Sequence, residues 1–200
     1  MTNKLNKRNK ANELAQASEI TSYLYSTLGL KTDADLLLWR VAASPDALQD
    51  SLSRLLLTGL GRYLDVTHTF NGLVRPSKYV RRATTQEQAL FEQERQRYFI
   101  VYPFTKTIEW YLMSQDARQG MMNEHIRVGH EFPSVRQLLV YSTGLDDQEF
   151  IVAYETDELD AFQGLVIALR STEARRYTLR DTPIFTCVHR PVAGTLALLG

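Results

Sequence analysis

Residues 135–154 read VRQLLVYSTGLDDQEFIVAY, two apolar runs with a polar, glycine-containing segment between them. The first run predicts a strand over 135–142, and the second predicts a strand over 150–154. Segment 144–147, Gly-Leu-Asp-Asp, predicts the turn that joins them, because glycine and aspartate favour tight turns. The pattern therefore indicates an antiparallel β-hairpin, from which the neighbouring elements can be placed.

Helices and strands are predicted on both sides of this hairpin. In chain order they are a strand over 96–104, a helix from Ser114 or Asp116 to about His130, a helix opened by 156–158 whose apolar stripe ends at Leu169, and a strand over 183–188. Together with the hairpin, residues 96–188 follow the order β-α-β-β-α-β. This is the order of a ferredoxin-like module.

The N-terminal half shows a similar but less clear order. Its predicted elements are a strand over 35–42, a helix over about 45–57 with Ser44 as its N-cap, and a strand over 63–70 that stops at Asn71-Gly72. The series strand, capped helix, Arg-Tyr, strand occurs around Arg62-Tyr63 and again around Arg176-Tyr177, which indicates an internal duplication. Since any two strand-helix-strand units look alike, a chance similarity stays open as the alternative.

The two halves together predict an α+β fold, with two ferredoxin-like modules whose sheets pack face to face or join into a barrel. We expect a flexible tail over 1–18, an N-terminal module over 19–95 and a C-terminal module over 96–200. With 200 residues, of which 44% are hydrophobic, the chain is long enough for one large domain or two small ones.

Composition excludes several classes of protein. Lys and Arg number 23, as do Asp and Glu, so no overall charge favours nucleic acid or an anionic membrane. Cys187 is the only cysteine, which rules out an intrachain disulfide, a cysteine-rich zinc site and an iron–sulfur cluster built by one chain. It falls in a predicted strand and is expected to be a core residue. No export signal and no run of about 18 apolar residues is visible, so we expect a soluble, cytoplasmic protein.

Four residue types suited to redox chemistry gather in one short part of the chain. Tyr102 and Lys106 lie at the end of a predicted strand, Trp110 follows, and His125 lies on a predicted helix where it shares a face with Met121. Each has an ordinary alternative: a surface tyrosine, a lysine that extends to water, a core tryptophan, a hydrogen-bonded core histidine. Phosphate loops, nucleophile elbows and paired-carboxylate signatures are absent from the sequence, which argues against a nucleotide enzyme or a hydrolase.

A two-histidine metal site is disfavoured. The sequence contains four histidines, and the only close pair, His125 and His130, has a spacing of five, whereas two ligands on one helix face need three or four. A single neutral imidazole in a methionine-lined environment does suit a haem iron.

Several ordered motifs together resemble the chlorite dismutase superfamily, and most of all its coproheme decarboxylase branch. They are Tyr102-Pro103-x-x-Lys106, Trp110-Tyr111-Leu112, Met121-x-x-x-His125-x-x-x-Gly129, Gly144-Leu145-Asp146-Asp147-x-Glu149 and Leu169-Arg170-x-Thr172-Glu173-Ala174-Arg175. The resemblance implies a dimeric α+β barrel subunit, a homopentamer, and one porphyrin bound in the C-terminal module. The chain departs from the family pattern by being short between Val80 and Arg97.

The resemblance also implies roles for single residues. His125 matches the iron ligand, and Met121 lies on the same predicted helix face. Tyr102 matches a redox tyrosine, and Lys106 matches a lysine beside a propionate. Two further cofactor contacts are implied at Trp110 and Tyr79.

One implied position depends on the alignment. Counting from the hairpin turn places Gln137 at the position where decarboxylases of this branch carry a distal glutamine and chlorite dismutases carry an arginine. A shift of one residue would place Arg136 there instead.

The function implied is the hydrogen-peroxide-dependent oxidative decarboxylation of iron-coproporphyrin to haem b. In that reaction Tyr102 would give up an electron and a proton, and its radical would take hydrogen from a propionate, with Lys106 as the carboxylate partner. The alternatives are a chlorite dismutase or peroxidase-like haem enzyme, and a non-catalytic haem-binding protein of the same fold.

Overall fold

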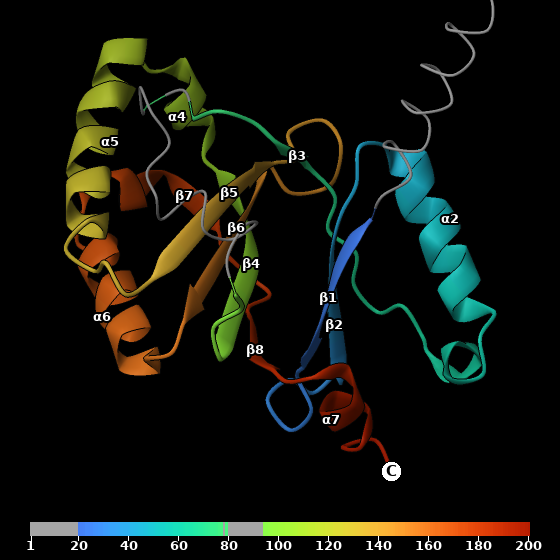
Figure 1. The fold of residues 1–200 in the computed structure, drawn as a ribbon. Coiled ribbons are helices and arrows are strands. Elements are labelled where there is room, and N and C mark those ends of the chain that lie inside the picture. The colour runs from blue at the N-terminus through green and yellow to red at the C-terminus, as the bar shows by residue number, and fades with distance from the viewer. Residues whose placement is uncertain (1–19, 78, 80–93) are drawn as a thin grey trace, which may run out of the picture.

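The computed structural model of the chain describes residues 20–77, 79 and 94–200 (Figure 1). The tail predicted over 1–18 lies outside the described residues, as does segment 80–93 of the predicted N-terminal module.

The described strands form one antiparallel sheet that curls around an apolar interior (Figure 1). The strands are β1 (Thr21–Ser26), β2 (Leu36–Val41), β3 (Leu73–Val74), β4 (Tyr98–Lys106), β5 (Arg136–Tyr141), β6 (Phe150–Thr156), β7 (Thr178–Arg180) and β8 (Phe185–His189). Their order across the sheet is β2-β1-β8-β4-β6-β5-β3, and β7 pairs with the end of β4. The two halves therefore share one sheet, joined where β1 pairs with β8 and where β3 pairs with β5.

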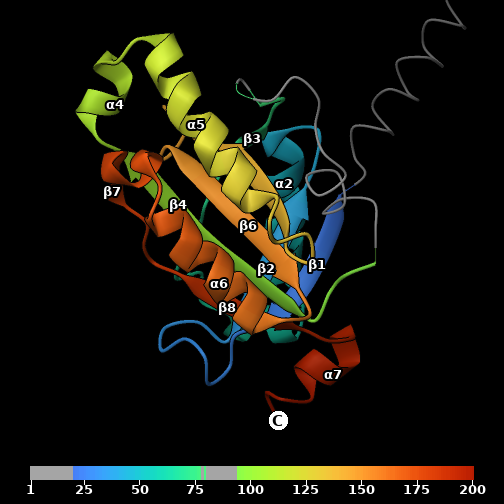
Figure 2. The same cartoon turned by 90° about the vertical axis from the view of Figure 1, so that its left-hand side faces the viewer.

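Helices cover the outer faces of this sheet. They are α2 (Pro45–Leu56), α4 (Ile108–Leu112), α5 (Gln115–Gly129), α6 (Leu159–Arg170) and α7 (Val192–Leu196), with 3-10 helices η1 (Leu60–Tyr63) and η2 (Glu173–Tyr177). Helices α5 and α6 lie side by side over β4, β6 and β5 (Figure 2). Helix α2 lies at the other end of the molecule, beside β1 and β2 (Figure 1).

Local sequence signals set the helix starts. Ser44 accepts a hydrogen bond from the Ala47 backbone N–H at 3.3 Å, and Pro45 occupies the first turn of α2. Ser114 caps α5 in the same way, through the Ala117 N–H at 3.2 Å. Such caps supply hydrogen-bond acceptors to the backbone N–H groups that have no partner within the first turn of a helix.

Strand alternation divides the core into two layers. On β4, Phe99 and Val101 face the interior of the curled sheet, where Tyr25 and Phe185 also lie. Ile100, between them, faces the opposite way, toward the layer beneath α5 and α6. Because side chains of a strand point alternately to its two faces, β4, β5 and β6 contribute to both layers.

Most of the predicted elements are confirmed. The hairpin forms with Tyr141 paired to Phe150, and Gly144 at its turn has φ +77°, a conformation that glycine adopts without strain. Residues 96–188 show the β-α-β-β-α-β order, so the predicted ferredoxin-like α+β fold is confirmed.

The strand predicted over 63–70 is wrong. Tyr63 ends η1, and the chain then runs to Gly72 without strand pairing, with most of its side chains exposed. Strand β1 was not predicted. The internal duplication is visible as β2-α2-η1 and β6-α6-η2, each 3-10 helix ending at an Arg-Tyr pair, but it does not extend to a strand after Tyr63.

Candidate functional site

A cavity of about 660 Å³ lies between α5, the faces of β4, β6 and β5, η2, residues 75–77 and Tyr79. This volume is within the range of small-molecule sites, roughly 300–1,000 Å³. Six of the seven residues predicted from sequence line it: Tyr79, Tyr102, Lys106, Trp110, His125 and Gln137. The segment 75–79 belongs to the N-terminal half, so both halves of the chain build the cavity wall.

His125 is held by α5 in an environment that keeps it neutral. Burial, and secondarily the nearby Lys106 ammonium, lowers the pKa of His125 to about 4. Its Nδ1 atom is buried and has no hydrogen-bond partner among the described residues. Buried polar atoms normally have partners. A neutral imidazole that lines a cavity and carries an orphaned nitrogen fits an iron porphyrin, which takes histidine as an axial ligand.

Of the two neighbouring methionines on α5, Met122 lines the cavity and the predicted Met121 is not among its lining residues. Successive helical residues are rotated by about 100°. The cavity face of α5 is formed by Gln115, Arg118, Met122, His125 and Ile126, and Met121 is rotated to the side of that face.

Gln137 and Arg136 face opposite sides of β5. Gln137 lines the cavity, and its Nε2 atom lies 3.7 Å from where a Cβ would stand on Gly129, one helical turn beyond His125. Arg136 faces the interior of the curled sheet, where its Nη1 atom lies 3.7 Å from Glu155 Oε2 and donates to the Glu94 carbonyl oxygen at 2.9 Å. The register with Gln137 at the cavity is the one the structure has.

Tyr102 points from β4 into the cavity layer. Burial is the main cause of a raised pKa for Tyr102, so the phenol stays protonated at neutral pH. It also borders a second, smaller cavity of about 340 Å³, together with Arg170 and Asp181. The side chain is therefore a neutral hydrogen donor at the junction of two cavities.

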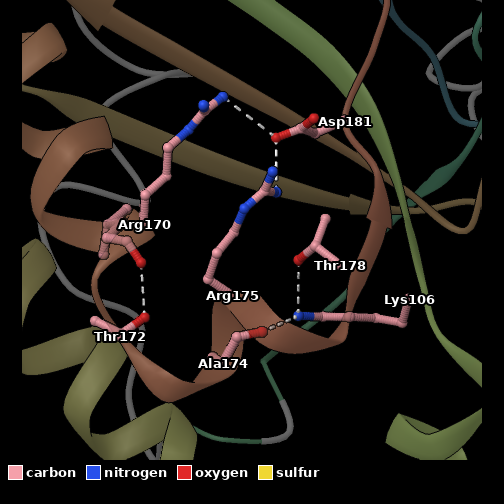
Figure 3. A network of polar contacts seen from close by, with 8 residues as sticks. Lys106, Arg170, Thr172, Ala174, Arg175, Thr178 and Asp181 are labelled. Atoms are coloured by element: carbon pink, nitrogen blue, oxygen red, sulfur yellow. Dashed lines mark hydrogen bonds and ion pairs between the residues drawn. The ribbon is translucent and has the colours of Figure 1, made fainter.

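Lys106 lies at the end of β4 with its ammonium directed toward η2. Its Nζ donates to the Ala174 carbonyl oxygen at 3.1 Å and to Thr178 Oγ1 at 3.4 Å (Figure 3). Nζ also lies 4.5 Å from the ring centroid of the buried Trp110. Burial, and secondarily the charge of Arg175, lowers the pKa of Lys106 to about 8. The ammonium is therefore charged at neutral pH but loses its proton more easily than an exposed lysine.

Trp110 forms one wall of the cavity. It is buried between the rings of Tyr79 and Tyr177, whose centroids lie 6.4 Å and 5.9 Å away. The backbone oxygen of Tyr79 accepts a hydrogen bond from Gln119 Nε2 at 3.2 Å, which attaches the segment before it to α5. An aromatic wall of this kind suits a flat ligand.

Arginines enrich the described cavity lining in positive charge. Arg170 and Arg175 both reach Asp181, at 3.6 Å and 2.8 Å (Figure 3). Arg118 also lines the cavity, and its buried Nε has no partner among the described residues. Counting Arg75 and Lys106, five basic side chains and one carboxylate line the described cavity, which suits a ligand with several anionic groups.

Sequence reasoning assigned no site role to these arginines. A signal for Arg118 was present, because it lies seven residues before His125 and so on the same helix face. Arg170 and Arg175 belong to one of the motifs that carry the resemblance, but their shared contact with Asp181 could not be read from that motif.

Within the described ranges, no group of three or more His, Cys, Asp and Glu side chains could hold a metal ion. None of the helices in the described part of the chain is both long and apolar enough to cross a membrane.

Comparison with known proteins matches this chain to the chlorite dismutase family and to two named relatives. The chlorite dismutase family model matches residues 3–190. Coproheme decarboxylase from Mycolicibacterium smegmatis is 35% identical over 177 residues, covering 88% of this chain and 76% of that protein. Chlorite dismutase from Ideonella dechloratans is 28% identical over 163 residues, covering 78% of this chain and 57% of that protein.

Solved structures agree. Chlorite dismutase from Candidatus Nitrospira defluvii in complex with imidazole superposes with a TM-score of 0.80 and 29% identity, covering 92% of this chain and 80% of that one. A variant of the same protein superposes with a TM-score of 0.82 and 30% identity, covering 92% of this chain and 80% of the other. The residues matched by the family model include every cavity residue named above.

Proposed function

Because the chain belongs to the chlorite dismutase family, we propose that it catalyses the hydrogen-peroxide-dependent oxidative decarboxylation of iron-coproporphyrin to haem b, a step of haem biosynthesis. The observation that carries this choice is Gln137, which lines the cavity while Arg136 is engaged with Glu155 on the other face of the sheet. A neutral amide gives no electrostatic preference to an anionic oxidant such as chlorite, whereas hydrogen peroxide is neutral.

The charge of the cavity supports the substrate class. Iron-coproporphyrin carries four propionates, two more than haem b. Among the described residues, five basic side chains line the cavity, and the one lining carboxylate, Asp181, already has two arginine partners. The orphaned Nε of Arg118 supplies a donor for one carboxylate. A porphyrin with four carboxylates can form more ion pairs with these basic side chains than a porphyrin with two.

His125 would hold the iron. Its imidazole is neutral and lines the cavity. When bound, the iron porphyrin would supply the oxidising power by reacting with peroxide. The protein groups around it would orient the propionates and move the hydrogen atoms.

Tyr102 would act as the hydrogen-atom relay. Its protonated phenol gives up one electron and one proton, and the phenoxyl oxygen then takes a hydrogen atom back from a propionate side chain. For each propionate, one peroxide and one proton are consumed, the bond to the carboxylate breaks, and one vinyl group, one carbon dioxide and two waters are formed. Two such reactions convert the substrate to haem b.

Lys106 would pair with a propionate next to Tyr102. With a pKa of about 8 the ammonium is charged at neutral pH and can also release its proton. Its position against Trp110 and Thr178 fixes the direction from which the carboxylate would be held.

Three features of organisation are part of the proposal. The C-terminal module, 96–200, would bind the porphyrin, with residues 75–77 and Tyr79 of the N-terminal module completing the wall. The chain would work as a homopentamer in the cytoplasm. Sedimentation of the purified protein tests the assembly.

The deciding experiment adds iron-coproporphyrin and hydrogen peroxide to the purified protein and weighs the porphyrin by mass spectrometry. Loss of two formic-acid equivalents is expected, and an unchanged porphyrin mass would refute the proposal. Oxygen release from chlorite at a comparable rate would favour a dismutase instead.

A matched pair of variants tests the relay. Tyr102→Phe should bind iron-coproporphyrin as the parent protein does but form no vinyl product. Tyr98→Phe, on the same strand but not among the cavity-lining residues, should react normally. Full turnover by Tyr102→Phe would exclude Tyr102 as the relay.

A further inference from the structure

Glu149 ends the turn of the β5–β6 hairpin, directly before Phe150, the first residue of β6. It closes the motif Gly144-Leu145-Asp146-Asp147-x-Glu149, which has no part in the proposed reaction. Its side chain is half-buried and is not among the described residues that line the cavity. Any effect of Glu149 on a bound porphyrin must therefore pass through another residue.

The end of β4 runs past the start of β6. The last pair between the two strands joins Phe104 to Phe150, so Lys106 has no partner on β6. On its other side β4 pairs with β7, where the register shifts between Thr105 and Lys106. A bulge of this kind turns the nearby side chains in a new direction and leaves the ladder of hydrogen bonds incomplete. The backbone of Lys106 thus needs a contact on the β6 side from outside the ladder.

Glu149 supplies that contact. Its carboxylate Oε2 accepts a hydrogen bond from the Lys106 backbone N–H at 2.7 Å, and its own backbone N–H donates to the Phe104 carbonyl oxygen at 3.3 Å. The Glu149 carbonyl oxygen in turn accepts from the Ser142 N–H at 2.8 Å and from Thr143 Oγ1 at 3.1 Å. Hydrogen bonds from an N–H to a carboxylate are stronger than those between neutral groups. The hairpin turn therefore fixes the last residues of β4.

The Lys106 side chain leaves its backbone in the opposite sense, toward η2 and the cavity. Its Nζ donates to the Ala174 carbonyl oxygen at 3.1 Å and to Thr178 Oγ1 at 3.4 Å (Figure 3). Among the contacts of the described residues, Glu149 forms no ion pair with this ammonium. An ammonium has three N–H donors, so one is left for a ligand carboxylate. Glu149 thus holds the backbone of Lys106 without occupying its charge.

We propose that Glu149 is a positioning residue for Lys106: its carboxylate holds the Lys106 backbone N–H at the bulge, so that the ammonium meets a porphyrin carboxylate from one fixed direction. This inference rests on the proposed function, in which Lys106 pairs with a propionate. Without the hydrogen bond the end of β4 would move more freely, and the ammonium would spend less of its time at the propionate.

The first test uses the protein without porphyrin and measures hydrogen exchange of single amides by mass spectrometry. Glu149→Ala removes the acceptor, whereas Glu149→Gln removes the charge but keeps an oxygen that can accept. Glu149→Ala should raise the exchange rate of the Lys106 amide about tenfold over the parent protein, the equivalent of one net hydrogen bond. Glu149→Gln should raise it less. The amide of Ile100, in the middle of β4, should exchange as in the parent protein. Equal Lys106 rates in the two variants would overturn the proposal.

The second test measures the Kd for metal-free coproporphyrin by fluorescence. Both variants lack the Glu149 charge, so a difference between them reports the hydrogen bond and not the charge near the cavity. At pH 7, Glu149→Ala should bind about three- to tenfold more weakly than Glu149→Gln. Well above pH 8 the Lys106 ammonium is lost, and the two variants should bind alike. General damage to the fold would weaken binding at every pH, and that result would refute the positioning role.

A double-variant cycle shows whether the effect passes through Lys106. In the Lys106→Met background, Glu149→Ala and Glu149→Gln should bind coproporphyrin with the same Kd, because the side chain to be positioned is gone. A difference that persists there would overturn the proposal.

Asp147→Asn is the matched control for loss of a turn carboxylate. Asp147 is exposed, and its bond within the turn, to Asp146 Oδ1, is made by its backbone N–H. Asp147→Asn should leave both the Lys106 exchange rate and the Kd for coproporphyrin unchanged. Effects equal to those of Glu149→Ala would contradict a specific role for Glu149.

The outcomes separate this inference from the function on which it rests. If the parent protein binds coproporphyrin but forms no vinyl product with peroxide, the proposed function fails, while a difference in Kd between the two Glu149 variants would still support the positioning of Lys106. If decarboxylation occurs but the two variants share one Kd at pH 7 and one kcat/KM, the positioning role is refuted and the function stands.

Discussion

Gln137 and Arg136 are consecutive in β5 but lie on opposite faces of the sheet, Gln137 in the cavity and Arg136 within 3.7 Å of Glu155. An arginine placed at 137 would bring a fixed positive charge to the cavity, where it can bind an anionic oxidant. Gln137→Arg should therefore raise oxygen release from chlorite above the parent level, measured with an oxygen electrode. Gln137→Met, which adds no charge, serves as the control and should show no gain.

Arg136 is expected to matter for stability and not for the cavity. Glu155 is fully buried, and Arg136 is one of two arginines beside it, Arg95 being the other at 3.2 Å. Arg136→Gln should lower the free energy of unfolding by about 1–3 kcal/mol, the cost of leaving a buried polar group under-satisfied. Urea unfolding of the parent protein and of Arg136→Gln measures this difference in the free energy of unfolding.

The control for Arg136 is an arginine of the surface. Arg127 pairs with Glu131 in an exposed i,i+4 contact, so Arg127→Gln should change the free energy of unfolding by less than about 0.5 kcal/mol. Equal losses in the two variants would contradict the distinction between the buried and the exposed pair.

His125→Ala should abolish iron ligation without closing the cavity. Iron-coproporphyrin should bind with the absorption spectrum of a porphyrin that lacks a histidine ligand. Metal-free coproporphyrin makes no iron bond, so its Kd, measured by fluorescence, should stay within about twofold of the parent value. A parent-like iron spectrum in His125→Ala would exclude His125 as the ligand, and loss of metal-free binding would point to a damaged fold.

The binding of coproporphyrin should depend on pH through Lys106. Burial lowers the pKa of this base from 10.5 to about 8 in the folded protein. The ammonium is present below pH 8 and is lost as pH rises through that value, so affinity for metal-free coproporphyrin should be full below pH 8 and weaken above it. Fluorescence titrations at several pH values measure the change.

Two substitutions define the contribution of Lys106. Lys106→Arg keeps the positive charge at every pH tested, so the affinity for metal-free coproporphyrin should no longer change around pH 8. Lys106→Met should bind weakly at every pH. A dependence that survives in both variants would have to come from another group.

Prediction from sequence succeeded where the signal was local. Ser114 and the following residues specify where α5 begins, and the glycine-containing turn specifies the hairpin, so the elements that carry His125 and Gln137 could be placed in advance. Tyr102, Lys106 and Trp110 also line one cavity as the resemblance implied.

Prediction failed where long-range pairing decides. The residues after Tyr63 alternate as a strand would but find no partner, whereas Thr21–Ser26, with no distinctive pattern, is a strand because β2 and β8 flank it. The choice between Met121 and Met122 required knowing which side of α5 faces the sheet.

The place of β8 in the sheet has a consequence for the making of the protein. This strand, Phe185–His189, lies between β1, the first strand described, and β4. A chain still leaving the ribosome can pair β3 with β5 early, but β1 cannot be joined to β4 through β8 until these last residues emerge, and such non-local closure is a slow step of folding. The residues that line the cavity all precede β8 in the chain, so the sheet closes only after every cavity-lining residue has been made.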